Sequence, residues 1–288
     1  MAEIITVINQ KGGVGKTTVA VNLSSFMSEY FKKILLLDFD PQSDASVWMC
    51  KHYGGEHTGY KTSPPPRIED ILRFGLQQSN LEDEAFRRQL KQFSKEASGN
   101  TEPAVITTSL NLDKIDREMT GIGERKATAK LVDTIKIISE DYDLVLIDTA
   151  PYISNLHYIV VSASDYILIP ITLDATAIGG GGNVITLILS DVIKYYNNPH
   201  VSVLGVLINN YEKVSNISKA MEDMASEVFG ELIFKTRIKS AVKLRELPLL
   251  NSTLDKIYPK LPLSQDFKNL AEEIYERMRG RRPRATTD

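Results

Sequence analysis

The sequence predicts an α/β fold, a doubly wound, mostly parallel sheet with helices on both faces. Short apolar, β-branched runs alternate along the chain with segments of helical periodicity, which is the pattern of consecutive β-α-β units. These runs contain few polar residues, as expected for strands that are covered on both faces. Ligand is then expected beyond the carboxyl ends of the strands. The predicted strands are residues 4–8, 34–37, 144–147, 166–171 and 203–208, and the clearest predicted helices are residues 16–31, 125–139 and 216–229.

Length and composition fit one large α/β domain or two small ones. The sequence has 288 residues, of which 42% are hydrophobic and 25% are charged. Because no repeat and no clean linker divides it, we expect a single domain over residues 1–278. A Gly- and Pro-rich loop followed by a charged, helix-favouring stretch predicts a surface insertion around residues 51–100. The Arg-rich residues 279–288 are expected to form a flexible tail.

Composition disfavours several classes of protein. Cys50 is the only cysteine, which excludes an intrachain disulfide and a thiolate metal site within one chain. No apolar run reaches the ~20 residues that cross a bilayer, and no N-terminal leader is recognisable, so we expect a cytoplasmic protein. The formal net charge of −3 argues against a globally basic surface, although a local basic face could still bind nucleic acid.

Residues 9–18 have the composition of a phosphate-binding loop. They read Asn-Gln-Lys-Gly-Gly-Val-Gly-Lys-Thr-Thr and lie between the first predicted strand and a predicted helix. Glycines let backbone N–H groups turn toward phosphates, and the helix N-terminus adds its positive dipole end. Lys16 would then reach the β- and γ-phosphates, and the Thr17 hydroxyl would ligate Mg²⁺. Gln10 replaces the first glycine of the general pattern, and Lys11 is an additional lysine. A glycine-rich turn with incidental lysines is the alternative interpretation.

The string from Lys11 to Thr18, with its early lysine, resembles the deviant Walker A motif of the ParA/MinD ATPases. Residues 35–42, Leu-Leu-Leu-Asp-Phe-Asp-Pro-Gln, resemble the second motif of that family in the form typical of its ParA branch. Residues 143–151, Asp-Leu-Val-Leu-Ile-Asp-Thr-Ala-Pro, resemble its Walker B strand. Weaker similarity extends over residues 3–278, nearly the whole chain.

The resemblance implies an ATPase that closes as a homodimer over ATP and Mg²⁺. Lys11 would reach across the interface to the partner's phosphates, and Asp40 would orient or activate the attacking water. Asp148 would hold Mg²⁺ together with Thr17, with Asp38 near the metal. An aspartate at the end of an apolar strand can instead cap the next helix. The implied catalytic residues are Lys11, Lys16 and Asp40, and the implied phosphate-binding residues are Lys11, Gly12, Gly13, Val14, Gly15, Lys16, Thr17 and Thr18.

The base-binding residues are harder to identify. Asn209 and Asn210 follow the last predicted strand, where the family often contacts adenine, but an Asn pair also suits a turn. Residues 235–239, Lys-Thr-Arg-Ile-Lys, lie where relatives commonly have Ile-Pro-Arg, and here Lys239 replaces the proline. Residues 179–182, four glycines, lack a following Lys-Ser/Thr, so we expect a helix entry near the dimer face and not a second phosphate loop.

Four functional classes of this family can be tested against the residues of the sequence. One cysteine cannot supply the cluster of a nitrogenase-type iron protein. The C-terminal residues have almost no apolar face, which disfavours a MinD-like membrane helix, and no terminal tyrosine cluster suggests a kinase. ParA-like partition remains, in which an ATP-bound dimer binds nucleoid DNA without sequence preference.

In a ParA-like protein, a ParB-like or small centromere-binding partner would stimulate hydrolysis and so segregate plasmid or chromosomal DNA. The candidate DNA-binding residues are Lys239, Lys243 and Arg245, beside Lys235 and Arg237, with a possible second patch at Arg277 and the following arginines. These cations could equally be solvated surface charges. Positioning of a protein cargo and a nucleotide switch without turnover are the alternative functions.

Overall fold

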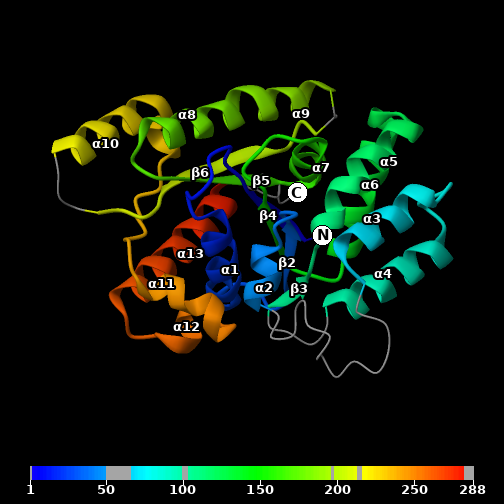
Figure 1. Cartoon of the computed structure of the whole chain (residues 1–288), viewed down its shortest axis with the longest axis horizontal. Coiled ribbons are helices and arrows are strands. Elements are labelled where there is room, and N and C mark those ends of the chain that lie inside the picture. Colours follow the sequence, from blue (N-terminus) through cyan, green and yellow to red (C-terminus); the bar gives the residue numbers. More distant parts are fainter. Residues whose placement is uncertain (1, 50–65, 99–102, 196–197, 213–215, 282–288) are drawn as a thin grey trace, which may run out of the picture.

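The computed structural model describes residues 2–49, 66–98, 103–195, 198–212 and 216–281. Within these residues six strands form one sheet in the order β3-β2-β4-β1-β5-β6, and every neighbouring pair is parallel. This confirms the predicted doubly wound α/β fold (Figure 1). The strands are β1 (Glu3–Val7), β2 (Ile34–Phe39), β3 (Ala104–Ile106), β4 (Leu144–Thr149), β5 (Tyr166–Ile171) and β6 (Ser202–Ile208).

Helices connect the strands and cover both faces of the sheet. Between β1 and β3 lie α1 (Lys16–Phe26), η1 (Met27–Glu29), α2 (Asp44–Met49), α3 (Ile68–Gln77) and α4 (Glu84–Ser98). Between β3 and β5 lie η2 (Leu110–Asp113), α5 (Lys114–Ile122), α6 (Glu124–Ser139) and α7 (Asn155–Ala163). Between β5 and β6 lie α8 (Ala175–Asn183), the π-helix η3 (Val184–Leu189) and α9 (Ser190–Tyr195). After β6 come α10 (Asn216–Phe229), η4 (Gly230–Leu232), α11 (Lys243–Glu246), η5 (Leu247–Leu250), α12 (Leu254–Ile257) and α13 (Pro262–Arg281).

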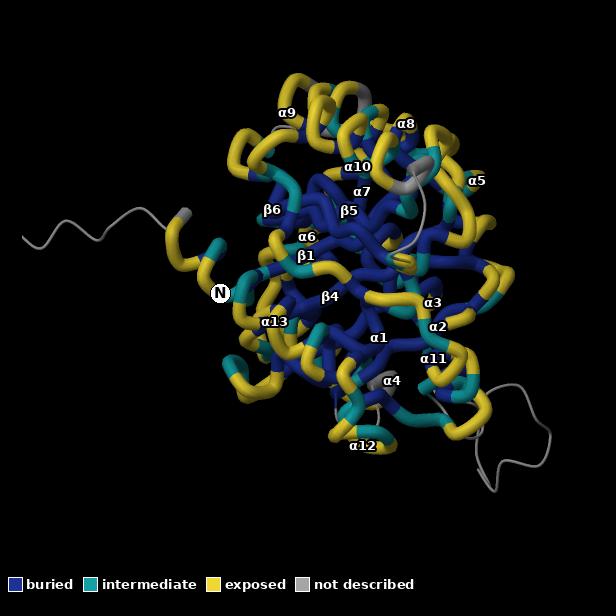
Figure 2. The backbone as a smooth tube through the Cα atoms, turned by 90° about the vertical axis from the view of Figure 1, so that its left-hand side faces the viewer, coloured by how far each residue is buried: buried dark blue, intermediate teal, exposed yellow. Residues whose placement is uncertain are grey.

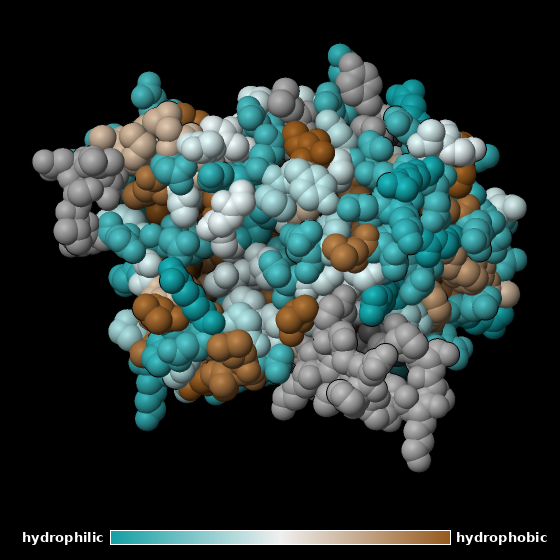
Figure 3. Space-filling view, viewed as in Figure 1, coloured by the Kyte–Doolittle hydropathy of each residue, from teal (hydrophilic) through white to brown (hydrophobic). Residues whose placement is uncertain are grey.

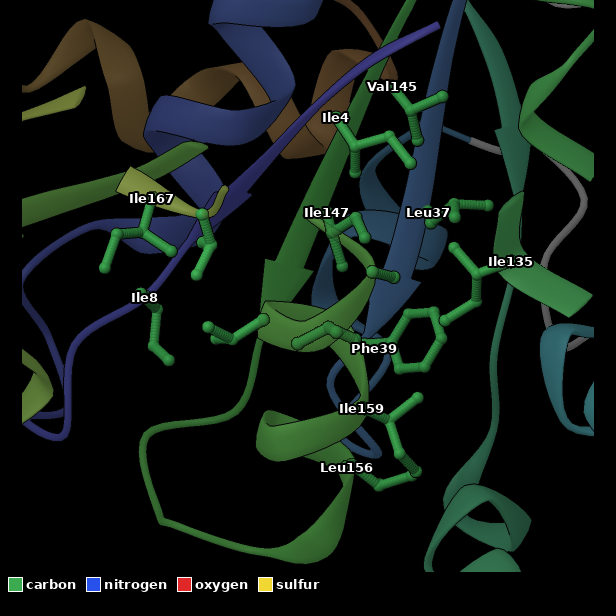
Figure 4. Close-up of a cluster of buried hydrophobic side chains, with 14 of the residues drawn as sticks. Ile4, Ile8, Leu37, Phe39, Ile135, Val145, Ile147, Leu156, Ile159 and Ile167 are labelled. Carbon is green, nitrogen blue, oxygen red and sulfur yellow. The ribbon is translucent and has the colours of Figure 1, made fainter. Parts of the chain in front are cut away.

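Two apolar clusters, one on each face, hold the layers together. Because successive strand side chains point to opposite faces, β4 contributes Val145 and Ile147 to one cluster and Leu144 and Leu146 to the other. The first cluster, part of which Figure 4 shows, packs under helices α3 to α10. The second packs under α1, α2 and α11 to α13. The strands therefore run buried between helices whose outer turns are exposed (Figure 2).

The edge strand β3 was missed by the sequence prediction. It has three residues and, among the described residues, pairs with β2 alone, where Leu37 lies opposite Ile106. A run this short cannot be distinguished from a loop by its periodicity. The segment that follows β3 nevertheless lies beside the end of β2, and this placement matters for the site described below.

The described part of the expected insertion belongs to the core. Helix α4 buries Phe86 and Leu90, and Phe86 stacks on Phe74 of α3 with a centroid distance of 5.1 Å. The charged face of α4 therefore conceals an apolar stripe that packs against α3. The surface insertion around residues 51–100 stays a prediction. The preceding loop, residues 50–65, lies outside the described residues. At the other end, α13 continues to Arg281, so the predicted tail begins as helix, and residues 282–288 lie outside the described part.

The continuous helical stretch Ala175–Lys194, which spans α8, η3 and most of α9, is long and apolar enough to cross a membrane by length and composition alone. It is also a packed element of the domain, since 40% of it is buried. A Cβ on Gly181 would lie only 3.2 Å from both Ile169 of β5 and Phe229 of α10. The sequence analysis expected no apolar run of this length, so that expectation is corrected by this stretch, part of which packs against β5 and α10.

Candidate nucleotide-binding site

A cleft of about 600 Å³ opens at the carboxyl ends of the parallel strands. This is the edge at which open α/β sheets bind their ligands. One end of the cleft is formed by the glycine-rich loop after β1 and by Asp40 after β2. The other end is formed by residues after β6, including Asn209, Asn210, Glu212, Leu244 and Arg245. The cleft is large enough for a nucleotide, with its phosphates at the glycine end.

The loop after β1 has the backbone conformation of a phosphate cradle. Gly13 and Gly15 adopt left-handed φ angles of 78° and 87°, which glycine reaches without strain. Gly15 is the residue before α1 and provides no side chain that caps the helix. The first N–H groups of α1 are therefore left for a ligand, and a helix N-terminus with free amides favours an anion.

Asn209 fixes this loop to the end of β6. Its side-chain Nδ2 donates to the Val14 carbonyl oxygen over 2.7 Å, and its backbone N–H donates to the Ile171 carbonyl oxygen over 2.8 Å. A Cβ on Gly15 would lie only 2.2 Å from the Asn209 Nδ2. The buried Oδ1 of Asn209 has no hydrogen-bond partner among the described residues. Asn210, the next residue, has a left-handed φ of 52° and is exposed. The two asparagines therefore form a turn, and both also line the cleft.

Lys16 lies buried at the floor of the cleft. Its Nζ donates to the Lys11 carbonyl oxygen over 3.4 Å, and only 6% of the residue is exposed. Burial lowers the pKa of Lys16, while the nearby carboxylates of Asp148 and Asp40 oppose that shift. An incoming polyphosphate would add negative charge at this point, so the lysine is placed where it can neutralise a phosphate. The side chain of Lys11, by contrast, is exposed.

Asp148, the next-to-last residue of β4, lies near Thr17 at the start of α1. It is fully buried, and within the described part of the chain no donor makes a hydrogen bond of good geometry to either carboxylate oxygen, although the Thr17 hydroxyl is close enough to stabilise the charge. Burial, and next the charge of Asp38, raise the pKa of Asp148, and the neighbouring Thr17 hydroxyl partly offsets the shift. A buried carboxylate that lacks a hydrogen bond of good geometry requires an explanation. Two free oxygens beside a hydroxyl are a donor set that fits a hard cation such as Mg²⁺.

Asp38 lies next to Asp148 across β2 and β4 but is differently engaged. Its Oδ1 accepts from the Asp40 N–H over 3.0 Å, and its Oδ2 accepts from the N–H and the hydroxyl of Ser46 over 2.8 and 2.6 Å. Burial raises the pKa of Asp38. Both oxygens of Asp38 already accept hydrogen bonds from the protein, so this residue stabilises the turn after β2. Its oxygens are therefore less available to a metal than those of Asp148.

Asp40 presents its carboxylate to the cleft. Its Oδ1 accepts from the Gln42 N–H over 2.9 Å, and the residue is 6% exposed. Burial raises the pKa of Asp40, and the charge of Lys16 opposes the shift. The structure thus brings together Lys16, Asp40 and Asp148, whose side chains the sequence had placed in one site.

A family model described as an AAA domain matches residues 2–203. The chain is 27% identical over 274 residues to the chromosome-partitioning ATPase Soj of Thermus thermophilus, and the match covers 95% of this chain and 96% of Soj. It is 25% identical over 284 residues to the chromosome partitioning protein ParA of Caulobacter vibrioides, with 98% and 97% covered. The chain belongs to the ParA family of ATPases. The family is one of NTPases, and the cleft at the glycine loop is the candidate nucleotide site.

A solved structure supports the fold of this ParA-family chain. Apo McdA from Cyanothece superposes with a TM-score of 0.74 at 19% identity, covering 96% of this chain and 100% of McdA. At this level of identity the similarity concerns the fold alone. It confirms the doubly wound arrangement independently of the motifs.

The basic residues predicted to bind DNA in this ParA-family chain are exposed, and three of them, including Arg237, pair with acidic neighbours. Lys239 pairs with Asp266 at 3.1 Å, and Lys243 pairs with Glu246 at 2.9 Å. Exposed pairs of this kind contribute little to stability and can open for another anion. Arg245 lies on the wall of the nucleotide cleft itself. Figure 3 shows that polar surface on this face is interrupted by apolar patches over α11 and α12.

Arg277 has a structural role, which corrects its assignment to a second DNA-binding patch. Its guanidinium donates to the carbonyl oxygens of Leu204, Leu232 and Ile233 over 2.8 to 3.1 Å. It also lies over the ring of Phe234 at 4.0 Å from the centroid. These contacts tie α13 to β6 and η4, so Arg277 is not available to a nucleic acid.

Sequence reasoning missed a histidine that shapes the loop after Asp148. The Nδ1 of His157 accepts from the Ser154 N–H over 3.2 Å, so Nε2 carries the proton and donates to the Ala150 carbonyl oxygen over 3.0 Å. Burial lowers the pKa of His157 to about 4. The neutral ring thereby braces the turn that places Pro151 on the cleft wall. The spacing Ser-x-x-His at a helix start was the available signal, because it resembles a capping box.

Proposed function

We propose that this chain is a Mg²⁺-dependent ATPase of DNA partition. The single observation that supports ATP and Mg²⁺ most directly is the arrangement at the glycine end of the cleft. Free amides at the start of α1, a buried lysine and an orphaned carboxylate beside a threonine hydroxyl together match a metal-bound triphosphate. Relatives named as partition proteins along nearly the whole chain support the cellular role.

Each residue of the site has a distinct task in this proposal. The loop amides from Gly12 to Thr18 hold the phosphates, and Lys16 neutralises the β- and γ-phosphoryl oxygens. Thr17 and Asp148 hold Mg²⁺, which supplies charge neutralisation at the transferred phosphoryl group. Asp38 acts behind them as a positioning residue. Asp40, with its carboxylate at the cleft, accepts a hydrogen bond from the attacking water and orients it in line with the γ-phosphate.

The proposal extends to assembly and location. The exposed side chain of Lys11 is free to reach the phosphates of a second copy, so two chains close over two ATP molecules. The ATP-bound dimer binds nucleoid DNA in the cytoplasm through Lys239, Lys243 and their basic neighbours. A centromere-binding partner then stimulates hydrolysis and releases the dimer from DNA.

Phosphate release and DNA binding test the two parts separately. The wild-type chain should release phosphate from ATP only with Mg²⁺, and Lys16→Ala should abolish nucleotide binding. DNA of random sequence should be retained with ATP and lost on raising the salt concentration, because each neutralised phosphate steepens the salt dependence. Phosphate release without any salt-sensitive DNA binding would preserve the ATPase but refute partition, and would favour a protein cargo.

A further inference from the structure

A buried hydroxyl, that of Ser46 in α2, supports the carboxylates of the site from behind. Ser46 is fully buried, and both its N–H and its hydroxyl donate to the same Oδ2 of Asp38. The other oxygen of Asp38 accepts the Asp40 N–H. Ser46 thus holds Asp38, and Asp38 holds the backbone at Asp40.

The direction of the Ser46 hydroxyl is fixed by its second partner. The Thr108 N–H, which can only donate, gives a hydrogen bond of 3.0 Å to the Ser46 Oγ. The proton of Ser46 must therefore point to Asp38, over 2.6 Å. A hydroxyl with one defined donor and one defined acceptor has a single orientation, so this link is more rigid than a surface serine would be.

Thr108 is anchored in turn by Glu69 of α3. The carboxylate of Glu69 accepts from the Thr108 hydroxyl over 3.3 Å and from the Ser109 hydroxyl. It is a buried acid, with only 2% of the residue exposed. The start of α3 is also tied to this segment, because the Ile68 N–H donates to the Thr107 carbonyl oxygen over 2.9 Å.

We propose that Ser46 is a positioning residue for ATP hydrolysis, and that Glu69 sets its orientation through Thr108. The chain of contacts runs from α3, through the segment after β3, to Asp38 and the water-orienting Asp40. Ser46 is buried and does not line the cleft, so it acts on the turnover step and leaves nucleotide binding unchanged. This inference rests on the proposed ATPase function and adds to it a control of the site by the α3 segment.

Three variants test the chain. Ser46→Ala removes the hydroxyl, Ser46→Thr keeps it, and Glu69→Gln changes the far anchor without altering any residue at the cleft. Ser139→Ala is the matched control, because Ser139 is also buried and its hydroxyl donates only within α6, to the Ile135 carbonyl oxygen. Phosphate-release rates, the affinity for ATP and thermal unfolding are measured for each.

We expect Ser46→Ala to lower kcat about tenfold and Glu69→Gln about threefold, with the Kd of ATP changed less than twofold. Ser46→Thr should restore most of the rate, and Ser139→Ala should leave it unchanged. If Ser46→Ala turns over at the wild-type rate, or loses affinity as much as rate, the positioning role is refuted. If Ser46→Ala does not fold, Glu69→Gln decides by the same criterion. A wild-type chain that releases no phosphate would refute the ATPase proposal itself, and this inference with it.

Discussion

Gly15→Ala tests whether the contact between the phosphate loop and Asn209 shapes the site. An alanine at a φ of 87° is in the left-handed region, which costs a residue with a Cβ about 1–2 kcal/mol. The new Cβ would also lie 2.2 Å from the Asn209 Nδ2, so the amide must move and lose its 2.7 Å bond to the Val14 carbonyl oxygen. That loss adds about 1–2 kcal/mol.

The free energy of unfolding should therefore fall by roughly 2–4 kcal/mol, which lowers Tm by at least about 4 °C in a chain of this size. ATP binding should be lost, because the loop amides no longer converge. Urea denaturation and isothermal titration measure the two effects. Gly12→Ala is the control for the stability measurement: Gly12 has no left-handed φ, and among the described residues its Cβ would meet only Pro151, at 3.9 Å.

A double-mutant cycle separates the clash from the backbone cost. Asn209→Ala alone should cost about 1–2 kcal/mol for the lost bond. With Asn209 truncated, Gly15→Ala should pay only the left-handed φ, so the double variant should be more stable than the sum of the single effects predicts. Simple additivity would refute the reasoning, because it would mean that the two residues do not meet.

Three further predictions concern the floor and the back of the site. Asp148→Asn should remove the Mg²⁺ dependence of nucleotide binding. It should also raise the free energy of unfolding, because it removes a buried carboxylate that lacks a hydrogen bond of good geometry. A lowered free energy of unfolding would show that the carboxylate has a stabilising partner. The pKa of His157 is lower in the folded than in the unfolded chain, so the free energy of unfolding should fall as the pH drops from about 6.5 to about 4. His157→Gln should flatten this pH dependence in thermal unfolding. An unchanged pH dependence would refute the buried, neutral state of His157. Arg277→Met should cost about 2–3 kcal/mol in urea denaturation and leave DNA binding unaltered, whereas weakened DNA binding at full stability would return Arg277 to a nucleic-acid surface.

The sequence predicted what depends on local order and could not predict what depends on distant contacts. The strand, loop and helix around Lys16 are contiguous, so their periodicity and glycines carry the information. Ser46 and Thr108 meet only because β2 and β3 pair, and β3 is too short to recognise from its residues. The difference between Asp38, which is hydrogen-bonded, and Asp148, which is not, likewise arises from neighbours that the motif does not contain.

One of the four glycines of α8, Gly180, lies tightly against the root of the glycine loop. A Cβ on Gly180 would lie 2.6 Å from the Asn9 Oδ1 and 3.5 Å from the Lys11 nitrogen. A Cβ on the next residue, Gly181, would lie 3.2 Å from side chains of both β5 and α10. A side chain at residue 180 would therefore displace Asn9, whose Oδ1 accepts from the Lys11 N–H at the start of the glycine loop. The absence of a side chain at this position of α8 is thus a condition for the shape of the loop.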